Sequence, residues 1–367
     1  MTAIPRPRSF LFIGGAPRTG TSMLLRSLDW HPDILMFPRE VTHLANLYYS
    51  GQWVRPADQA KELMFGNSAA IESFRQVFAG HEQELFDYYG TFSASGFRLA
   101  FDRAMQSSAA NPIRQYFEAL ASALLGGSPR ESQRYGNGNP TLAFKLPYFS
   151  EAAFDTLHEL SADVRLIHLR RNPQSRYLSA KARTSNPRRG APGLMDYTTF
   201  QALLPAASLT MANAAKRSHP NDVHFTTYEE MRSGAGGLGD IAAFLKVDWD
   251  NVLTQQTLHG YSQHLPSAYG FRNEGGESDD GRRHRAAQAL ANQAELAYVT
   301  ALDEAAGGQS YDLHTIMELG NEPFVDEPDE ARNLRQSFLK EQLQRMIAEG
   351  AGAEMARTIR THRLGAM

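Results

Sequence analysis

The chain alternates short apolar runs with longer stretches of helical periodicity. Runs rich in β-branched and aromatic residues predict strands, and apolar residues that return every three or four positions predict helices between them. This alternation indicates a parallel sheet covered by helices, an α/β fold with three layers, α/β/α. The predicted strands cover residues 9–14, 142–146, 164–169 and 223–227.

The helical pattern continues to the C-terminus. We expect one α/β domain over residues 1–285, with a mostly helical insertion at 44–140, and a helical extension over 286–367 packed on the same domain. The Gly/Ser/charged stretch 273–283 predicts a loop. The predicted helices cover residues 21–30, 41–49, 112–125, 151–160, 174–185, 197–218, 240–245, 285–306 and 327–348.

The first strand leads into a glycine-rich turn and then a helix, the local architecture of a phosphate-binding loop. Glycines let the backbone turn tightly, and the first N–H groups of the helix have no intrahelical partners, so they can bind an anion. The sequence here is GAPRTGTS. Candidate anion ligands are the N–H groups of Thr19, Gly20, Thr21 and Ser22.

The cation of this loop stands in an unusual place. The nucleoside-triphosphatase loop has a lysine after its second glycine, and that position is Thr21 here. The nearest cation is Arg18, inside the turn, where a guanidinium can fork across two oxygens of a group close to the loop. The loop therefore suits a shorter anion than a triphosphate.

With this loop the chain resembles the sulfotransferase family, whose members move a sulfonate from 3′-phosphoadenosine 5′-phosphosulfate (PAPS) to an acceptor. The segment VRLIHLRRNPQSRYLSAKAR, residues 164–183, is similar to the family's strand-loop-helix that binds the 3′-phosphate. The resemblance implies that Arg18 and the loop bind the 5′-phosphosulfate. It also implies that Arg171 and Ser179 bind the 3′-phosphate, and that adenosine 3′,5′-bisphosphate (PAP) is released.

The same segment argues against a kinase from the residues alone. Kinases and NTPases end a second apolar strand in an acidic residue that holds Mg²⁺, which a transferring phosphoryl group needs. Here the strand ends in Arg170 and Arg171, which attract an anion and repel Mg²⁺, so we expect no metal. The alternative is an arginine pair that binds helix carboxylates on the surface.

Glu40 is the candidate general base, because the acceptor hydroxyl must lose a proton as it attacks sulfur. It follows an HPD turn at residues 31–33 and resembles the catalytic glutamate that several sulfotransferase branches place after such a turn. The alternative is a glutamate that stabilises the dipole of a helix starting near Arg39. His43, on the same predicted helix face, is a second candidate that could orient the acceptor.

Lys145 ends a predicted strand and resembles the lysine that cytosolic sulfotransferases place beside the transferring sulfonate. Those enzymes have a catalytic histidine two residues on, where this chain has Pro147, so a histidine mechanism is excluded and the base role falls to Glu40. The alternative for Lys145 is a strand-end lysine that reaches solvent.

Two further segments resemble nucleotide contacts of the family. Tyr228, in TTYEEM, stands where the family places a tyrosine near the adenine, and its alternative is core packing. Arg272, in GFRNEGG, resembles the arginine of a loop that closes over the 3′-phosphate. Arg282 and Arg283 compete for the same role, and a solvated charge run is the alternative for all three.

Composition limits the partners and the compartment. The net charge of −3 over 367 residues gives no global basic field, so we expect no nucleic acid partner. We expect a small-molecule, glycan or lipid alcohol as the acceptor. The 0 cysteines are compatible with a reducing cytoplasm, and we expect a cytoplasmic protein with neither a signal peptide nor a membrane span. The C-terminal helices could form a lid or a homodimer contact.

The sequence therefore predicts a PAPS-dependent sulfotransferase that acts on a small or weakly charged alcohol, with aromatic residues of the 44–140 insertion available to line its pocket. One alternative is a metal-dependent P-loop kinase, which requires an acidic strand end. The other is a non-catalytic nucleotide-binding protein.

Overall fold

The computed structural model describes the sheet, most of its covering helices and parts of the C-terminal region. Predictions at residues 41–49, 273–283 and 327–348, and the proposed domain boundary at 285, lie outside the described residues. The described residues are 7–40, 93–106, 112–136, 138–146, 149–158, 163–184, 205, 208–209, 211–233, 235–258, 261–262, 296, 299–300 and 303–304.

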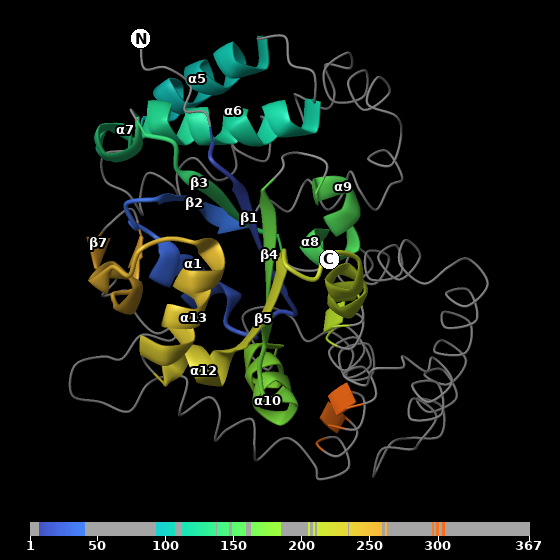
Figure 1. Ribbon diagram of the computed structural model, residues 1–367. Coiled ribbons are helices and arrows are strands. Elements are labelled where there is room, and N and C mark those ends of the chain that lie inside the picture. The colour runs from blue at the N-terminus through green and yellow to red at the C-terminus, as the bar shows by residue number, and fades with distance from the viewer. Residues whose placement is uncertain are drawn as a thin grey trace.

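Five strands form the central sheet, in the order β2-β3-β1-β4-β5, and each pairing within it is parallel (Figure 1). A second, two-stranded antiparallel sheet pairs β6 (Thr257–Leu258) with β7 (Tyr261–Ser262). The strands of the central sheet are β1 (Phe10–Gly15), β2 (Ile34–Glu40), β3 (Thr141–Lys145), β4 (Val164–Arg170) and β5 (Val223–Thr227).

Helices cover both faces of the central sheet, which gives the predicted three layers. Figure 1 shows α1 and α13 on one side of the sheet and α8 and α9 on the other. Every residue of β1 is buried, as expected for a parallel strand covered on both faces. The described helices are α1 (Thr21–Leu28), α5 (Ala94–Gln106), α6 (Pro112–Gly127), α7 (Pro129–Tyr135), α8 (Phe149–Ala152), α9 (Phe154–His158), α10 (Pro173–Thr184), α12 (Tyr228–Arg232) and α13 (Ala235–Leu245). In the described part of the chain, no helix combines the length and apolar character needed to cross a bilayer.

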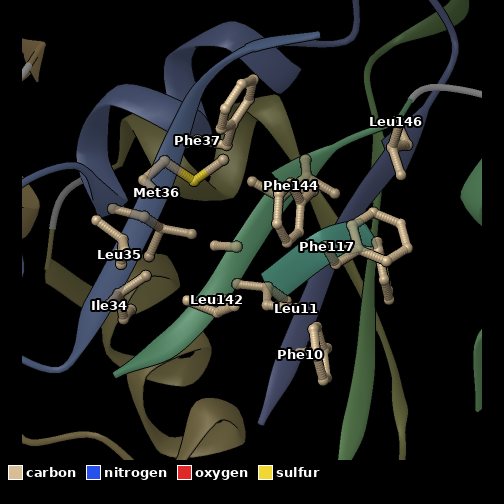
Figure 2. Close-up of a cluster of buried hydrophobic side chains, with 14 of the residues drawn as sticks. Phe10, Leu11, Ile34, Leu35, Met36, Phe37, Phe117, Leu142, Phe144 and Leu146 are labelled. Carbon is tan, nitrogen blue, oxygen red and sulfur yellow. The ribbon is translucent and has the colours of Figure 1, made fainter. Parts of the chain in front are cut away.

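Aromatic side chains join α6 to the sheet. Phe117 of α6 is fully buried, and its ring centroid lies 5.2 Å from that of Phe12 and 4.7 Å from that of Phe144. Figure 2 shows Phe117 beside Phe144 and Phe10, with the side chains of β2 on the far side of β3. Phe10 and Phe12 share one face of β1, so α6 packs on that face.

The structure corrects several sequence predictions. Strand β2 was not predicted, because Pro38 interrupts its apolar run and proline is excluded from central strands. The sheet accommodates it because β2 lies at one end of the strand order and its register with β3 shifts between Met36 and Glu40. The helix predicted at 151–160 is two short helices, α8 and α9, and the helix at 21–30 ends at Leu28. Helices α5 and α7 lie in the insertion predicted to be mostly helical, but their bounds were not predicted.

We predict that Phe117→Ala destabilises the fold by about 3–5 kcal/mol, because it removes the ring that packs against three phenylalanines and leaves a cavity. Urea unfolding followed by circular dichroism measures the change. Leu99→Ala on α5 is the control: Leu99 is 51% exposed, so its truncation should change stability by no more than about 0.5 kcal/mol. Equal losses from the two variants would contradict the packing described.

Candidate active site

Those predicted site residues that the structure describes lie at one edge of the central sheet. Because its strands are parallel, their carboxyl ends share one edge, which is where ligands bind in open α/β sheets. The glycine-rich loop follows β1, Glu40 ends β2, Lys145 ends β3, Arg171 follows β4, and Tyr228 follows β5. Five separate segments of the sequence thus meet in one place.

The loop between β1 and α1 has the backbone of an anion-binding turn. Gly15 and Gly20 have φ of 120° and 103°, a region that side chains with a Cβ rarely adopt, and Arg18 lies at φ 74°. A Cβ on Gly15 would also lie 2.5 Å from the carbonyl oxygen of Leu169. The Thr19 hydroxyl closes the turn by donating to the Ala16 carbonyl at 2.7 Å.

The first N–H groups of α1 are available to a ligand. Gly20 is the N-cap residue and provides no side-chain cap, so the helix start depends on an external acceptor. Among the described residues, none accepts a hydrogen bond from the N–H groups of Gly20, Thr21 and Ser22. A phosphate or sulfonate oxygen is the acceptor that such a helix start favours.

The two predicted anion-binding segments contact each other directly. Arg18 donates from Nε to the Ser179 hydroxyl at 3.0 Å, which joins the loop to α10. Arg171 donates from Nη1 to the Arg18 carbonyl at 3.2 Å. The Nε of Arg171 is buried and has no hydrogen-bond partner among the described residues, so it is a donor available to an oxyanion.

Tyr228 lies under the Arg171 guanidinium, whose central carbon is 4.4 Å from the ring centroid, a cation–π contact that orients the arginine. The Tyr228 ring also approaches the loop, since a Cβ on Gly20 would lie 2.6 Å from its Cδ2.

A capping box fixes the start of α12: Thr227 and Glu230 exchange backbone-to-side-chain hydrogen bonds. The Thr227 N–H donates to the Glu230 carboxylate at 2.7 Å and lowers the pKa of that group.

Lys145 points at the loop helix. Its ammonium donates to the Ser22 hydroxyl at 2.9 Å, which puts a positive charge beside the free N–H groups of α1. The Cα of Glu40 is in register with that of Lys145 across the β2–β3 pair. Arg39 and Glu40 are therefore strand residues, and the segment after Glu40, where the alternative places a helix, lies outside the described residues.

Arg170 forms an ion pair with a carboxylate of the protein, which was the alternative to anion binding for this arginine pair. Its guanidinium binds the Asp303 carboxylate at 2.8 Å, and Gln174 donates to Thr300, so Thr300 and Asp303 lie against the start of α10. The remaining predicted site residues, His43, Arg272, Arg282 and Arg283, lie outside the described residues.

Sequence comparison agrees with this arrangement. The model of a family described as the sulfotransferase family matches residues 11–251, well over half of the chain. The chain belongs to the sulfotransferase family. The family and the fold support sulfonate transfer in general, and the predicted α/β fold is confirmed.

Two solved structures are similar to this sulfotransferase. One is the sulfotransferase domain from the Synechococcus PCC 7002 olefin synthase, at 17% identity and a TM-score of 0.44, over 83% of this chain and 97% of that one. The other is the sulfotransferase domain from the curacin biosynthetic pathway, at 17% identity and a TM-score of 0.38, over 68% of this chain and 78% of that one. No match was found among curated proteins.

A polar network beneath the loop of the sulfotransferase was not predicted. Glu151 of α8 accepts a hydrogen bond from the Gly15 N–H and another from His168 of β4, and all three are buried. A polar residue within the apolar run VRLIHL is the sequence signal that could have indicated it.

Two neighbouring histidines lie where β4 and β5 begin, at the opposite edge of the sheet: His158 precedes β4, and His219 precedes β5. His158, His219 and Asp222 offer ligand atoms within 4.8 Å of one another. The two imidazole rings are stacked, with centroids 4.1 Å apart, and each Nε2 contacts a different carboxylate, that of Asp222 or Asp155. The two histidines thus form two neighbouring hydrogen-bonded pairs with carboxylates.

We predict that Gly15→Ala destabilises the sulfotransferase, because the Cβ meets the Leu169 carbonyl and the positive φ costs about 1–3 kcal/mol. Gly239→Ala is the matched control. It lies inside α13 with nothing within 4 Å of the added Cβ, so alanine should stabilise by about 0.5–1 kcal/mol. Urea midpoints should move in opposite directions, and a neutral Gly15→Ala would argue against the loop backbone described.

Proposed function

We propose that this protein transfers a sulfonate from PAPS to an acceptor hydroxyl or amine and releases PAP. The observation that carries the proposal is the hydrogen bond between Arg18 of the loop and Ser179 of α10. It brings together the two segments that would bind the phosphosulfate and the 3′-phosphate. A donor with an anion at each end fits this pairing better than a nucleoside triphosphate does.

The residues of the site fit such a donor. The N–H groups of Gly20, Thr21 and Ser22 and the Arg18 guanidinium would hold the 5′-phosphosulfate, whereas the Thr19 N–H, also predicted, donates to the Ala16 carbonyl at 3.3 Å. Arg171, whose Nε is buried and lacks a partner among the described residues, would hold the 3′-phosphate together with Ser179. Tyr228 would lie near the adenine, and Arg272 is the proposed residue that closes over the 3′-phosphate.

The proposed reaction is an in-line displacement at sulfur. Glu40 would accept the proton of the acceptor hydroxyl as its oxygen forms a bond to sulfur, and His43 would orient that acceptor. The bond from sulfur to the bridging oxygen of the donor breaks, and its electron pair stays on PAP. Lys145 and Arg18 would stabilise the charge that develops on that oxygen. No metal is needed for this step.

The acceptor class is proposed from composition alone. The segment 44–140 is not unusually basic, so an uncharged or weakly charged alcohol is favoured over an anionic glycan. The chain has 0 cysteines, and we propose that it works in the reducing cytoplasm.

We predict that the protein binds PAP without Mg²⁺ and that Arg171→Ala weakens this binding roughly ten- to hundredfold, the loss expected for a charge-assisted hydrogen bond. Calorimetric titration with PAP, ADP and ATP, with and without Mg²⁺, measures it. Arg170→Ala is the matched control, since Arg170 is already paired with Asp303 and should leave PAP binding unchanged. Mg²⁺-dependent ATP binding without preference for the 3′-phosphate would overturn the proposal and favour the kinase.

We predict that Glu40→Gln lowers kcat by about 10²–10⁴-fold, the contribution of a general base, and leaves PAP affinity unchanged. Transfer of radiolabelled sulfonate from PAPS to a panel of alcohols and amines provides the assay. Glu118→Gln on α6, a carboxylate paired with Arg114, is the control and should keep full activity. PAP binding without transfer to any acceptor would support the non-catalytic alternative.

A further inference from the structure

Glu151 is a buried carboxylate that the proposed reaction does not use. Its side chain is 0% exposed, and its Oε1 accepts hydrogen bonds from three groups on three different segments. These donors are the Gly15 N–H, His168 Nδ1 at 2.8 Å and the Ser208 hydroxyl at 3.0 Å. Its Oε2 is buried and has no partner among the described residues. A carboxylate is costly to bury, so this network needs an explanation.

The contact with Gly15 connects Glu151 to the donor site. Gly15 is both the last residue of β1 and the first residue of the loop. Its N–H belongs to the Gly14–Gly15 peptide, the last peptide of the strand, so its hydrogen bond fixes the end of the strand from which the loop leaves the sheet. A Cβ on Gly14 would collide with the Glu151 carboxyl group, so the carboxyl lies directly against this stretch of backbone.

His168 and Ser208 hold the carboxylate in place. His168 is 2% exposed and packs edge-on against Phe225, with ring centroids 5.3 Å apart, so its imidazole has little freedom to turn away. Ser208 is fully buried. Glu151 itself is rigid as a result, and it can transmit that rigidity to the loop through Gly15.

We propose that Glu151 is a positioning residue of the donor site, which acts through the Gly15 N–H to aim the loop N–H groups at the 5′-phosphosulfate. This inference rests on the proposed function. In this proposal α8, which lies on one face of the sheet, orients the loop that follows β1 through the Glu151 side chain. Because the effect is confined to the loop, it concerns the 5′ end of the donor and not the 3′-phosphate.

The test compares two ligands that differ in the 5′-phosphate. Glu151→Met keeps the length of the side chain but removes the acceptor, whereas Glu151→Gln keeps an oxygen that can accept from Gly15. We expect Glu151→Met to weaken PAP binding roughly tenfold, as for one lost hydrogen bond to a charged group, and to leave affinity for adenosine 3′-monophosphate unchanged. Glu151→Gln should restore most of the PAP affinity.

Glu131→Met is the matched control, since Glu131 is likewise a buried glutamate, 2% exposed, but belongs to α7, which packs on α6. It should keep PAP affinity even where its thermal midpoint falls. All titrations are made well below each variant's unfolding transition. Equal loss of affinity for the two ligands in Glu151→Met, or no loss for either, would overturn the positioning role and leave a structural one.

Hydrogen exchange without ligand separates this inference from the proposed function. Glu151→Met should speed amide exchange in peptides that cover residues 14–22, with peptides of β3 and α6 unchanged, and Glu151→Gln should not. Failure of the wild type to bind PAP would contradict the proposed function. The amide exchange rates of residues 14–22 would still decide whether Glu151 orders the loop. Acceleration spread evenly over the protein, or none in the loop, would overturn the inference.

Discussion

The parallel direction of the five central strands is the constraint on which the site depends. Five segments far apart in the sequence each place a residue at a strand's carboxyl end, and parallel pairing brings these ends to one edge of the sheet. The core also supports the site. Phe117 packs against Phe12 and Phe144 and so holds α6 against β1 and β3, the strands that lead into the loop and end in Lys145. Reversal of one strand would move its residue to the opposite edge.

Much of this arrangement could be predicted from the sequence, because the signals were local. Buried parallel strands read as continuous apolar runs, so four of the five strands were found. The glycine-rich loop was found because its backbone needs glycine at Gly15 and Gly20, where φ is positive. The Arg18–Ser179 contact was not predicted, since no local pattern links residues so far apart, and the resemblance to a family implied only that both bind the same donor.

What could not be predicted depends on tertiary context. Pro38 argues against a strand unless one knows that β2 lies at the end of the sheet. Arg170 and Arg171 are adjacent in sequence, yet one binds Asp303 and the other faces the loop and Tyr228, a difference that arises from the C-terminal region and from β5. Glu151 carries no motif, because its three donors come from separate segments that only the fold brings together.

The hydrogen bond between Arg18 and Ser179 has a consequence for selectivity. It joins the loop to α10 through a contact within the protein, so the spacing between the two proposed anion sites is set by the protein. A nucleotide with a single phosphate group can satisfy one end of this span and leaves the other end hydrated. The protein would therefore discriminate among adenine nucleotides by the distance between their charged groups.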